Sequence, residues 1–150
     1  MKIRLSDRLV RGMSLGLDTS PVIYFIEGNP RYYSLVSEIF GWIDRGEIVG
    51  VTSFVTLCET LVAPIQERND DLLVEYYFKR THHPFLRILP IEQTVSEKAA
   101  ELRAHYRLRT PDAFQIAASL VSGCDAFLTN DLRLKQVTEI PILILDELEL

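Results

Sequence analysis

Four acidic residues stand where their carboxylates could gather around a metal ion: Asp18, Glu59, Asp112 and Asp131. Asp18 directly follows the apolar segment MSLGL, and Asp131 follows the segment DAFLT after one intervening residue. Asp112 lies in the first turn of a predicted helix, and Glu59 lies about two turns into another helix, among apolar neighbours. Carboxylates brought this close repel one another and raise one another's pKa unless a divalent cation neutralises them.

Oxygen ligands from Asp and Glu suit Mg²⁺ or Mn²⁺ better than zinc. Such an ion can activate water, stabilise a phosphoryl transition state and orient the leaving oxygen, so the acidic set predicts phosphodiester hydrolysis. Each residue also has a simpler explanation: Asp112 favours the helix dipole, Asp18 forms an Asx turn, Asp131 caps a short helix and Glu59 faces solvent. All four explanations would have to hold at one edge of the fold, so together they account for the pattern less well than a metal site does.

Strands alternate with helices along the chain. We expect strands over residues 13–18, 48–52, 85–91, 125–129 and 141–146, and helices over 21–27, 31–44, from 53 until Pro64 disturbs it, 70–80, about 94–106 and 110–122. This alternation predicts one α/β domain with three layers, α/β/α, around a parallel sheet of about five strands. Ligands of such sheets bind beyond the carboxyl ends of the strands, where Asp18 and Asp131 stand.

Composition narrows the classes of function. The net charge of −5 disfavours non-specific coating of DNA, although local arginines can still bind phosphates. No apolar run approaches the roughly 20 residues that span a bilayer, and the basic N-terminus lacks the apolar core of a secretory signal. Cys58 and Cys124 lie in apolar stretches without a CxxC pair, so we expect two buried thiols in a reducing cytoplasm and no zinc site.

Four segments carry a family resemblance: LDTSPVIYFIEGNP (17–30), SFVTLCETL (53–61), RTPDAFQIAAS (109–119) and CDAFLTNDLRLKQV (124–137). In this order and spacing they resemble the PIN-domain family, and within it the VapC-like toxins of bacterial and archaeal toxin–antitoxin pairs. The resemblance covers about residues 14 to 146. It implies a five-stranded parallel sheet and an acidic pocket that binds one or two Mg²⁺ or Mn²⁺ ions and cuts RNA.

The resemblance also implies roles for individual residues. Asp18, Glu59, Asp112 and Asp131 match the acidic positions of the family, and Asp125 stands where some members carry an additional acid. The supporting positions that orient carboxylates and water are matched by Thr19, Ser20, Thr129 and Asn130. The resemblance further implies a homodimer, for which the apolar faces at 31–44 and 70–80 are candidates, and a small antitoxin whose C-terminal segment enters the pocket.

Basic residues precede Asp112 and could hold the RNA. We predict phosphate contacts from Arg103, Arg107 and Arg109, with Lys98 nearby and Tyr106 available to stack a base. A solvated helix face is the alternative. The histidines, His82, His83 and His105, have no nucleophile beside them in the sequence pattern, so we interpret them as surface or helix-end residues.

The chain departs from the family at its start. Residues 1–12 form an N-terminal extension before a nuclease domain of residues 13–150, and Met13 is a hypothetical alternative start that intact mass from the native host would test. Other phosphoryl-transfer classes fit less well: a haloacid-dehalogenase-like phosphatase needs a second aspartate where Ser20 stands, and the acidic pair and lysine of a receiver domain are missing. Two alternatives stay open: a PIN-like protein that binds RNA or a partner without cutting, and a nuclease of RNA maturation.

Overall fold

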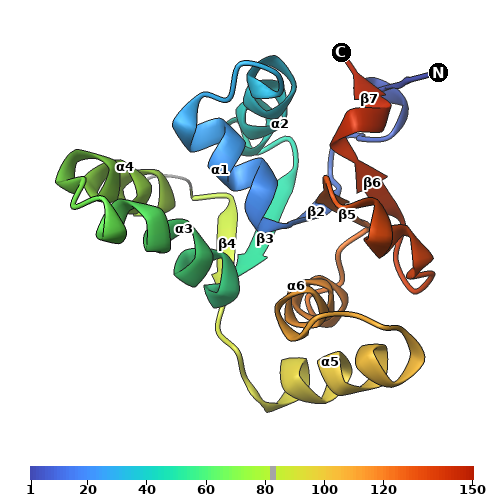
Figure 1. The fold of residues 1–150 in the computed structure, drawn as a ribbon. Helices are drawn as coiled ribbons and strands as arrows, with labels where there is room; N and C mark the ends of the chain where they lie inside the picture. The colour runs from blue at the N-terminus through green and yellow to red at the C-terminus, as the bar shows by residue number, and fades with distance from the viewer. Residues whose placement is uncertain (82–83) are drawn as a thin grey trace.

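The computed structural model describes residues 1–81 and 84–150, with side chains described for 1–75 and 84–150. Its centre is a five-stranded parallel sheet in the order β4-β3-β2-β5-β6 (Figure 1). The strands are β2 (Ser14–Leu17), β3 (Val49–Ser53), β4 (Leu86–Leu89), β5 (Ala126–Thr129) and β6 (Ile142–Ile144). Each strand expected from the sequence is present, and the predicted parallel arrangement is confirmed.

Helices cover both faces of the sheet, which confirms the three-layer α/β/α prediction (Figure 1). Helices α1 (Thr19–Glu27) and α2 (Tyr33–Asp44) pack on one face, and α5 (Gln93–His105) and α6 (Thr110–Val121) on the other. Helices α3 (Phe54–Gln66) and α4 (Asp70–Thr81) pack against each other and contact α1. The described part of the chain also contains short 3₁₀ segments at Leu5–Asp7, Leu132–Gln136 and Leu145–Glu147.

Alternation along β2 divides the core into two layers. Leu15 and Leu17 are fully buried in the cluster that includes α1 and α2. Gly16, between them, faces α6, where a Cβ would overlap the side chain of Ser119. The glycine therefore allows α6 to approach the sheet closely, and α6 carries two of the residues that matter below.

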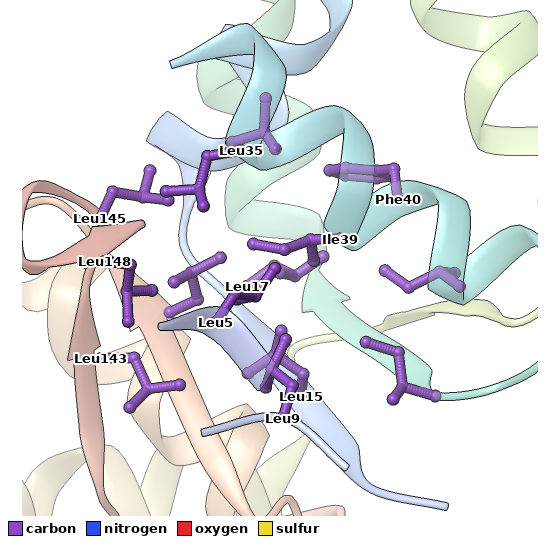
Figure 2. Packing of buried hydrophobic residues seen from close by; sticks show 14 of the residues in the cluster. Leu5, Leu9, Leu15, Leu17, Leu35, Ile39, Phe40, Leu143, Leu145 and Leu148 are labelled. Atoms are coloured by element: carbon purple, nitrogen blue, oxygen red, sulfur yellow. The ribbon is translucent and has the colours of Figure 1, made fainter. Parts of the chain in front are cut away.

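The first twelve residues contribute two leucines to the core. Strand β1 (Ile3–Arg4) pairs in parallel with β7 (Leu148–Glu149), which joins the two ends of the chain in a second, two-stranded sheet. Leu5 and Leu9 are 2% and 1% exposed and lie among Leu15, Leu35, Ile39 and Leu148 (Figure 2). The segment treated above as an extension thus covers apolar side chains of β2, β6 and α2.

Two helix boundaries differ from the sequence prediction. Helix α1 begins at Thr19 because the Asp18 side chain accepts a hydrogen bond from the Thr19 N–H and caps it. Helix α3 continues through Pro64 to Gln66, although the sequence predicts a disturbance at the proline. A proline removes one backbone donor from a helix, and the packing of the buried Pro64 side chain offsets that loss. No helix of the described residues is long and apolar enough to cross a membrane.

The prediction of two buried thiols was wrong for Cys58. Cys58 is exposed, because the buried face of α3 is formed by Thr56, Thr60 and Pro64, on the other side of the helix. Cys124 is partly buried, and desolvation raises the pKa of its thiol. His105 is exposed at the end of α5, whereas His82 and His83 lie outside the described residues.

Candidate active site

The carboxyl ends of β2 and β5 lie side by side because these strands pair, with Leu17 opposite Leu128. Asp18 and Thr129 come next on each strand, and the Thr129 hydroxyl donates a hydrogen bond of 2.7 Å to Asp18 Oδ2. A cavity of about 420 Å³ opens at this edge. Its lining consists of Asp18, Thr19, Ser20, Ile23, Tyr24, Glu59, Arg109, Asp112, Asn130, Asp131 and Leu132. All four acidic residues singled out from the sequence thus line one cavity.

Asp18 is partly buried at the end of β2, where it lines this cavity. Its Oδ1 accepts from the Thr19 N–H at 2.8 Å, and its Oδ2 accepts from Thr129. The pKa of Asp18 is raised to about 6: burial raises it most, the bonds from Thr129 and Thr19 lower it, and the charges of Asp112 and Glu59 add to the rise. Carboxylates from β2, α3 and α6 are therefore close enough to influence one another electrostatically.

Two of the acids are paired with arginines that follow or precede them closely in the sequence. Arg109 donates from Nε to Asp112 Oδ2 at 3.0 Å and from a terminal nitrogen to Oδ1 at 3.4 Å. Arg133 donates to Asp131 Oδ2 at 2.6 Å, and this bond holds the pKa of Asp131 below its usual value. Arg133 was not identified from the sequence, although its position two residues after Asp131 in a tight 3₁₀ turn was available as a signal.

Glu59 is oriented by polar groups that lie beneath the cavity in the protein interior. The Thr19 hydroxyl donates to Glu59 Oε1 at 2.8 Å, and Thr19 itself accepts a bond of 3.1 Å from Gln115 Nε2. Gln115 was also missed at the level of sequence. The sequence feature that could have revealed Gln115 is a single amide inside the apolar run AFQIAAS. It lies three residues after Asp112 and hence on the same side of α6.

The PIN-domain family model matches residues 16–140, which include all the residues that line this cavity. The chain belongs to the PIN-domain family. A comparison with curated proteins found no match.

Solved structures share the fold of this PIN domain at low sequence identity. VapBC2 from Rickettsia felis, bound to a DNA fragment from its promoter, has a TM-score of 0.70 at 14% identity, over 88% of this chain and 98% of that one. VapBC-1 from nontypeable Haemophilus influenzae has a TM-score of 0.70 at 13% identity, covering 89% and 99%. VapC20 from Mycobacterium tuberculosis, described as a toxin that cleaves the sarcin–ricin loop, has a TM-score of 0.63 at 16% identity, covering 85% and 98%.

The donor atoms of this PIN domain fit a hard divalent cation, because the four acids offer carboxylate oxygens and neither cysteine lines the cavity. Within the described side chains, no three acids, histidines or cysteines converge as a ready-made metal cluster. In this arrangement Asp112 faces Arg109 and Asp131 faces Arg133. Ligation by all four acids requires Asp112 and Asp131 to turn away from these arginines.

The remaining predicted residues of the PIN domain fall into two groups. Ser20 and Asn130 line the cavity, and Asn130 Oδ1 also accepts a bond of 3.1 Å from the Asp146 N–H. Asp125 does not join them, because it precedes β5 and its Oδ2 accepts a bond of 2.8 Å from the Ser14 N–H at the opposite edge of the sheet. The suggested metal role of Asp125 therefore has no support from its position.

The predicted RNA contacts are spread more widely than the acids. Arg109 lines the cavity and Arg107 is exposed, whereas Arg103 donates from Nε to the carbonyl of Leu108 at 3.2 Å. Tyr106, proposed to stack a base, donates its hydroxyl to Glu139 Oε1 at 2.6 Å. The structure thus brings Arg109 to the acids and leaves Arg107 available at the surface nearby.

Proposed function

We propose that this PIN domain is a Mg²⁺- or Mn²⁺-dependent endoribonuclease and the toxin of a VapBC-type toxin–antitoxin pair. The observation that carries the proposal is the single cavity at the ends of β2 and β5 that Asp18, Glu59, Asp112 and Asp131 line together. Family membership and the toxin folds that this chain resembles support it. The other cavities described lack such a set of acids.

The residues of the chain would hold the cation and prepare the substrate. When bound, Mg²⁺ or Mn²⁺ would ease deprotonation of water and neutralise charge on the phosphate. Asp18 is held by Thr129 and by the backbone of Thr19, so its carboxylate is presented to the cavity in a fixed orientation. Such preorganisation reduces the cost of assembling ligands at the moment of binding. Glu59 is held in the same way by the Thr19 hydroxyl.

The arginines provide a route for RNA toward these acids. Arg109 and Arg133 stand at the rim, each paired with an acid, and their guanidinium groups are mostly exposed. Guanidinium groups bind phosphate through two parallel hydrogen bonds, so phosphates entering the cavity can replace carboxylates as their partners. Arg107 is an exposed base close to Arg109 in the sequence, and Arg103 would have to leave the carbonyl of Leu108 to bind phosphate through its Nε.

Partners of the proposed toxin follow from its relatives and its surface. The Klebsiella pneumoniae structure of this fold is a toxin–antitoxin complex, which supports a small antitoxin partner for this chain. For the homodimer, the face at 31–44 is unsuitable because Leu35, Ile39 and Ile43 are buried. We place the dimer contact instead on an exposed apolar stripe of α3, which comprises Phe54, Cys58, Val62 and Ile65. The side chains of the other candidate face, 70–80, are described only as far as residue 75.

A cleavage assay tests the proposal directly. The purified chain, free of antitoxin, is incubated with a panel of structured RNAs that includes a sarcin–ricin-type loop, with Mg²⁺, with Mn²⁺ and with EDTA. We expect cleavage that needs metal, that the double variant Asp18→Asn/Asp112→Asn loses, and that the matched control Asp125→Asn keeps. Absence of cleavage by the folded wild-type protein under both metals, together with retained RNA binding, would favour the non-cleaving alternative. A neighbouring gene for a small DNA-binding antitoxin would separate a toxin from a nuclease of RNA maturation.

A further inference from the structure

Gln115 is a buried amide with a hydrogen-bonding partner at each end. The residue is 2% exposed, and its side chain reaches Ser53 at the end of β3 and Thr19 at the start of α1. Oε1 accepts from the Ser53 hydroxyl at 2.8 Å, and Nε2 donates to the hydroxyls of Thr19 and Thr56. A methionine would fill a similar space without the cost of burying an amide. The buried amide of Gln115 therefore has a role beyond filling space in the core.

The bonds around Gln115 have a defined direction. The Val55 N–H donates to Ser53 Oγ at 3.1 Å, so the Ser53 proton is free to point at Gln115 Oε1. Because Gln115 Nε2 donates to Thr19 Oγ1, the single proton of Thr19 is free for Glu59 Oε1 at 2.8 Å. Thr56 Oγ1 also lies 3.1 Å from Thr19 Oγ1, but a carboxylate is the stronger acceptor.

The result is a chain of donors from Ser53 through Gln115 and Thr19 to Glu59. It runs from the end of β3 through α6 and α1 to α3, and its last member lines the acidic cavity. Ser53, Thr19 and Gln115 are buried, so water does not compete for these bonds. This series of hydrogen bonds ends at Glu59 Oε1, which is therefore held from the interior of the protein.

We propose that Gln115 is a positioning residue that orients Glu59, through Thr19, for binding the divalent cation. The inference rests on the proposed nuclease function, since the cation belongs to that function. Groups that hold a metal ligand by hydrogen bonds typically change metal affinity 10- to 100-fold when they are removed. Gln115 thus acts on the cation without touching it.

Mn²⁺ affinity of the full chain, titrated by calorimetry without RNA, tests this role. We expect Gln115→Met and Thr19→Val each to weaken Mn²⁺ binding by roughly tenfold or more, and Thr19→Ser to keep it. The double variant Gln115→Met/Thr19→Val should bind no more weakly than Thr19→Val, because both changes break the same chain. If Gln115→Met does not fold, Gln115→Asn replaces it, since asparagine keeps an uncharged amide but is one methylene shorter and so does not span the distance from Ser53 to Thr19.

Ser119→Ala is the matched control. Ser119 lies one turn after Gln115 on α6, is 1% exposed and bonds within its own helix, to the Gln115 carbonyl. We expect Ser119→Ala to leave Mn²⁺ affinity unchanged. A Gln115 variant with wild-type Mn²⁺ affinity and only a lower melting temperature would overturn the inference, and so would additive losses in the double variant. If the wild-type chain binds no Mn²⁺, the proposed function fails and this inference with it, whereas wild-type binding unaffected by Gln115 removes this inference alone.

Discussion

The hydroxyl of Thr129 donates a hydrogen bond of 2.7 Å to Asp18 Oδ2 and so ties the end of β5 to the end of β2. This bond stabilises the ionised carboxylate against the burial that raises the pKa of Asp18 to about 6. We expect Thr129→Val to raise that pKa further and Thr129→Ser to restore it. Carbon-detected NMR titration of the Asp18 carboxyl measures this, with Asp18→Asn to assign the signal. An unchanged pKa in Thr129→Val would contradict the role given to the hydroxyl.

The partly buried Asp18 carboxylate should also lower the free energy of unfolding when no metal ion is bound. Its folded-state pKa of about 6 exceeds the ordinary aspartate value of 3.8, so the native state binds the proton more tightly than the unfolded state. The contribution of Asp18 to stability therefore falls as pH rises from about 4 to about 6. In EDTA, above about pH 6, we expect Asp18→Asn to be more stable than wild type by at most about 3 kcal/mol, because asparagine has one acceptor oxygen and loses the bond from either Thr129 or Thr19, which offsets part of the gain.

Urea unfolding of both proteins across the pH range provides the measurement. The difference should vanish near pH 3, where the aspartate is protonated in both states. Added Mn²⁺ should stabilise wild type and have little effect on Asp18→Asn, since a ligand of the native state raises stability by mass action. Equal stability of the two proteins at all pH values would show that Asp18 is better solvated than its position indicates.

The N-terminal segment supplies core side chains, so its removal should destabilise the whole fold. Leu9 is 1% exposed and packs in the cluster of Figure 2. We expect Leu9→Ala to lower the free energy of unfolding by about 2 to 5 kcal/mol, while the neighbouring Val10→Ala, at an exposed position, changes it little. A chain that starts at Met13 should lose more, because it lacks Leu5, Leu9 and β1. Equal stability of the truncated chain would support the Met13 start.

Arg107 gives a clean test of the RNA contacts because it is exposed and outside the acidic cavity. We expect Arg107→Ala to weaken binding to single-stranded RNA and to reduce the slope of log affinity against log salt by about 0.7 if one phosphate contact is lost. Arg11→Ala is the control, since Arg11 is also exposed and precedes the sheet. Filter binding at several salt concentrations measures both. Unchanged slopes would remove Arg107 from the substrate path.

The apolar stripe of α3 predicts how the dimer should respond to charge. Val62 is 48% exposed in the centre of the stripe. We expect Val62→Asp to convert a dimer into a monomer, because an unpaired charge in an apolar interface is strongly unfavourable. Light scattering during size exclusion measures the mass, and Val10→Asp, at a residue 57% exposed elsewhere, is the control. A dimer that survives Val62→Asp must use another face.

Short-range sequence signals were sufficient for the sheet and for the acids. Apolar runs such as DAFLT predict buried strands, and an aspartate after such a run must lie at the carboxyl edge of a parallel sheet. Asp18 and Asp131 followed directly from this rule. Glu59 and Asp112 followed from their positions on the helices that lead away from the same edge, helped by the family resemblance.

Long-range pairings were beyond the same reasoning. The two-residue strand β1 is too short to show a period, and its partner β7 lies at the other end of the chain. The arginine pairs of Asp112 and Asp131 depend on rotamers, and the bond from Gln115 to Thr19 depends on how closely α6 approaches α1. Cys58 was misplaced because apolar neighbours in sequence do not reveal which side of an amphipathic helix a residue occupies.

The parallel pairing of β1 with β7 has a consequence for synthesis on the ribosome. Leu5 and Leu9 are synthesised well before their partners Leu145 and Leu148, so the apolar surface around them stays open while the intervening residues are added. Chains fold during synthesis as segments become available, and exposed apolar surface is where chaperones and aggregation compete. Residues 3–4 and 148–149 meet at one corner of the molecule (Figure 1), so this part of the core closes only once residues 145–149 have left the ribosome.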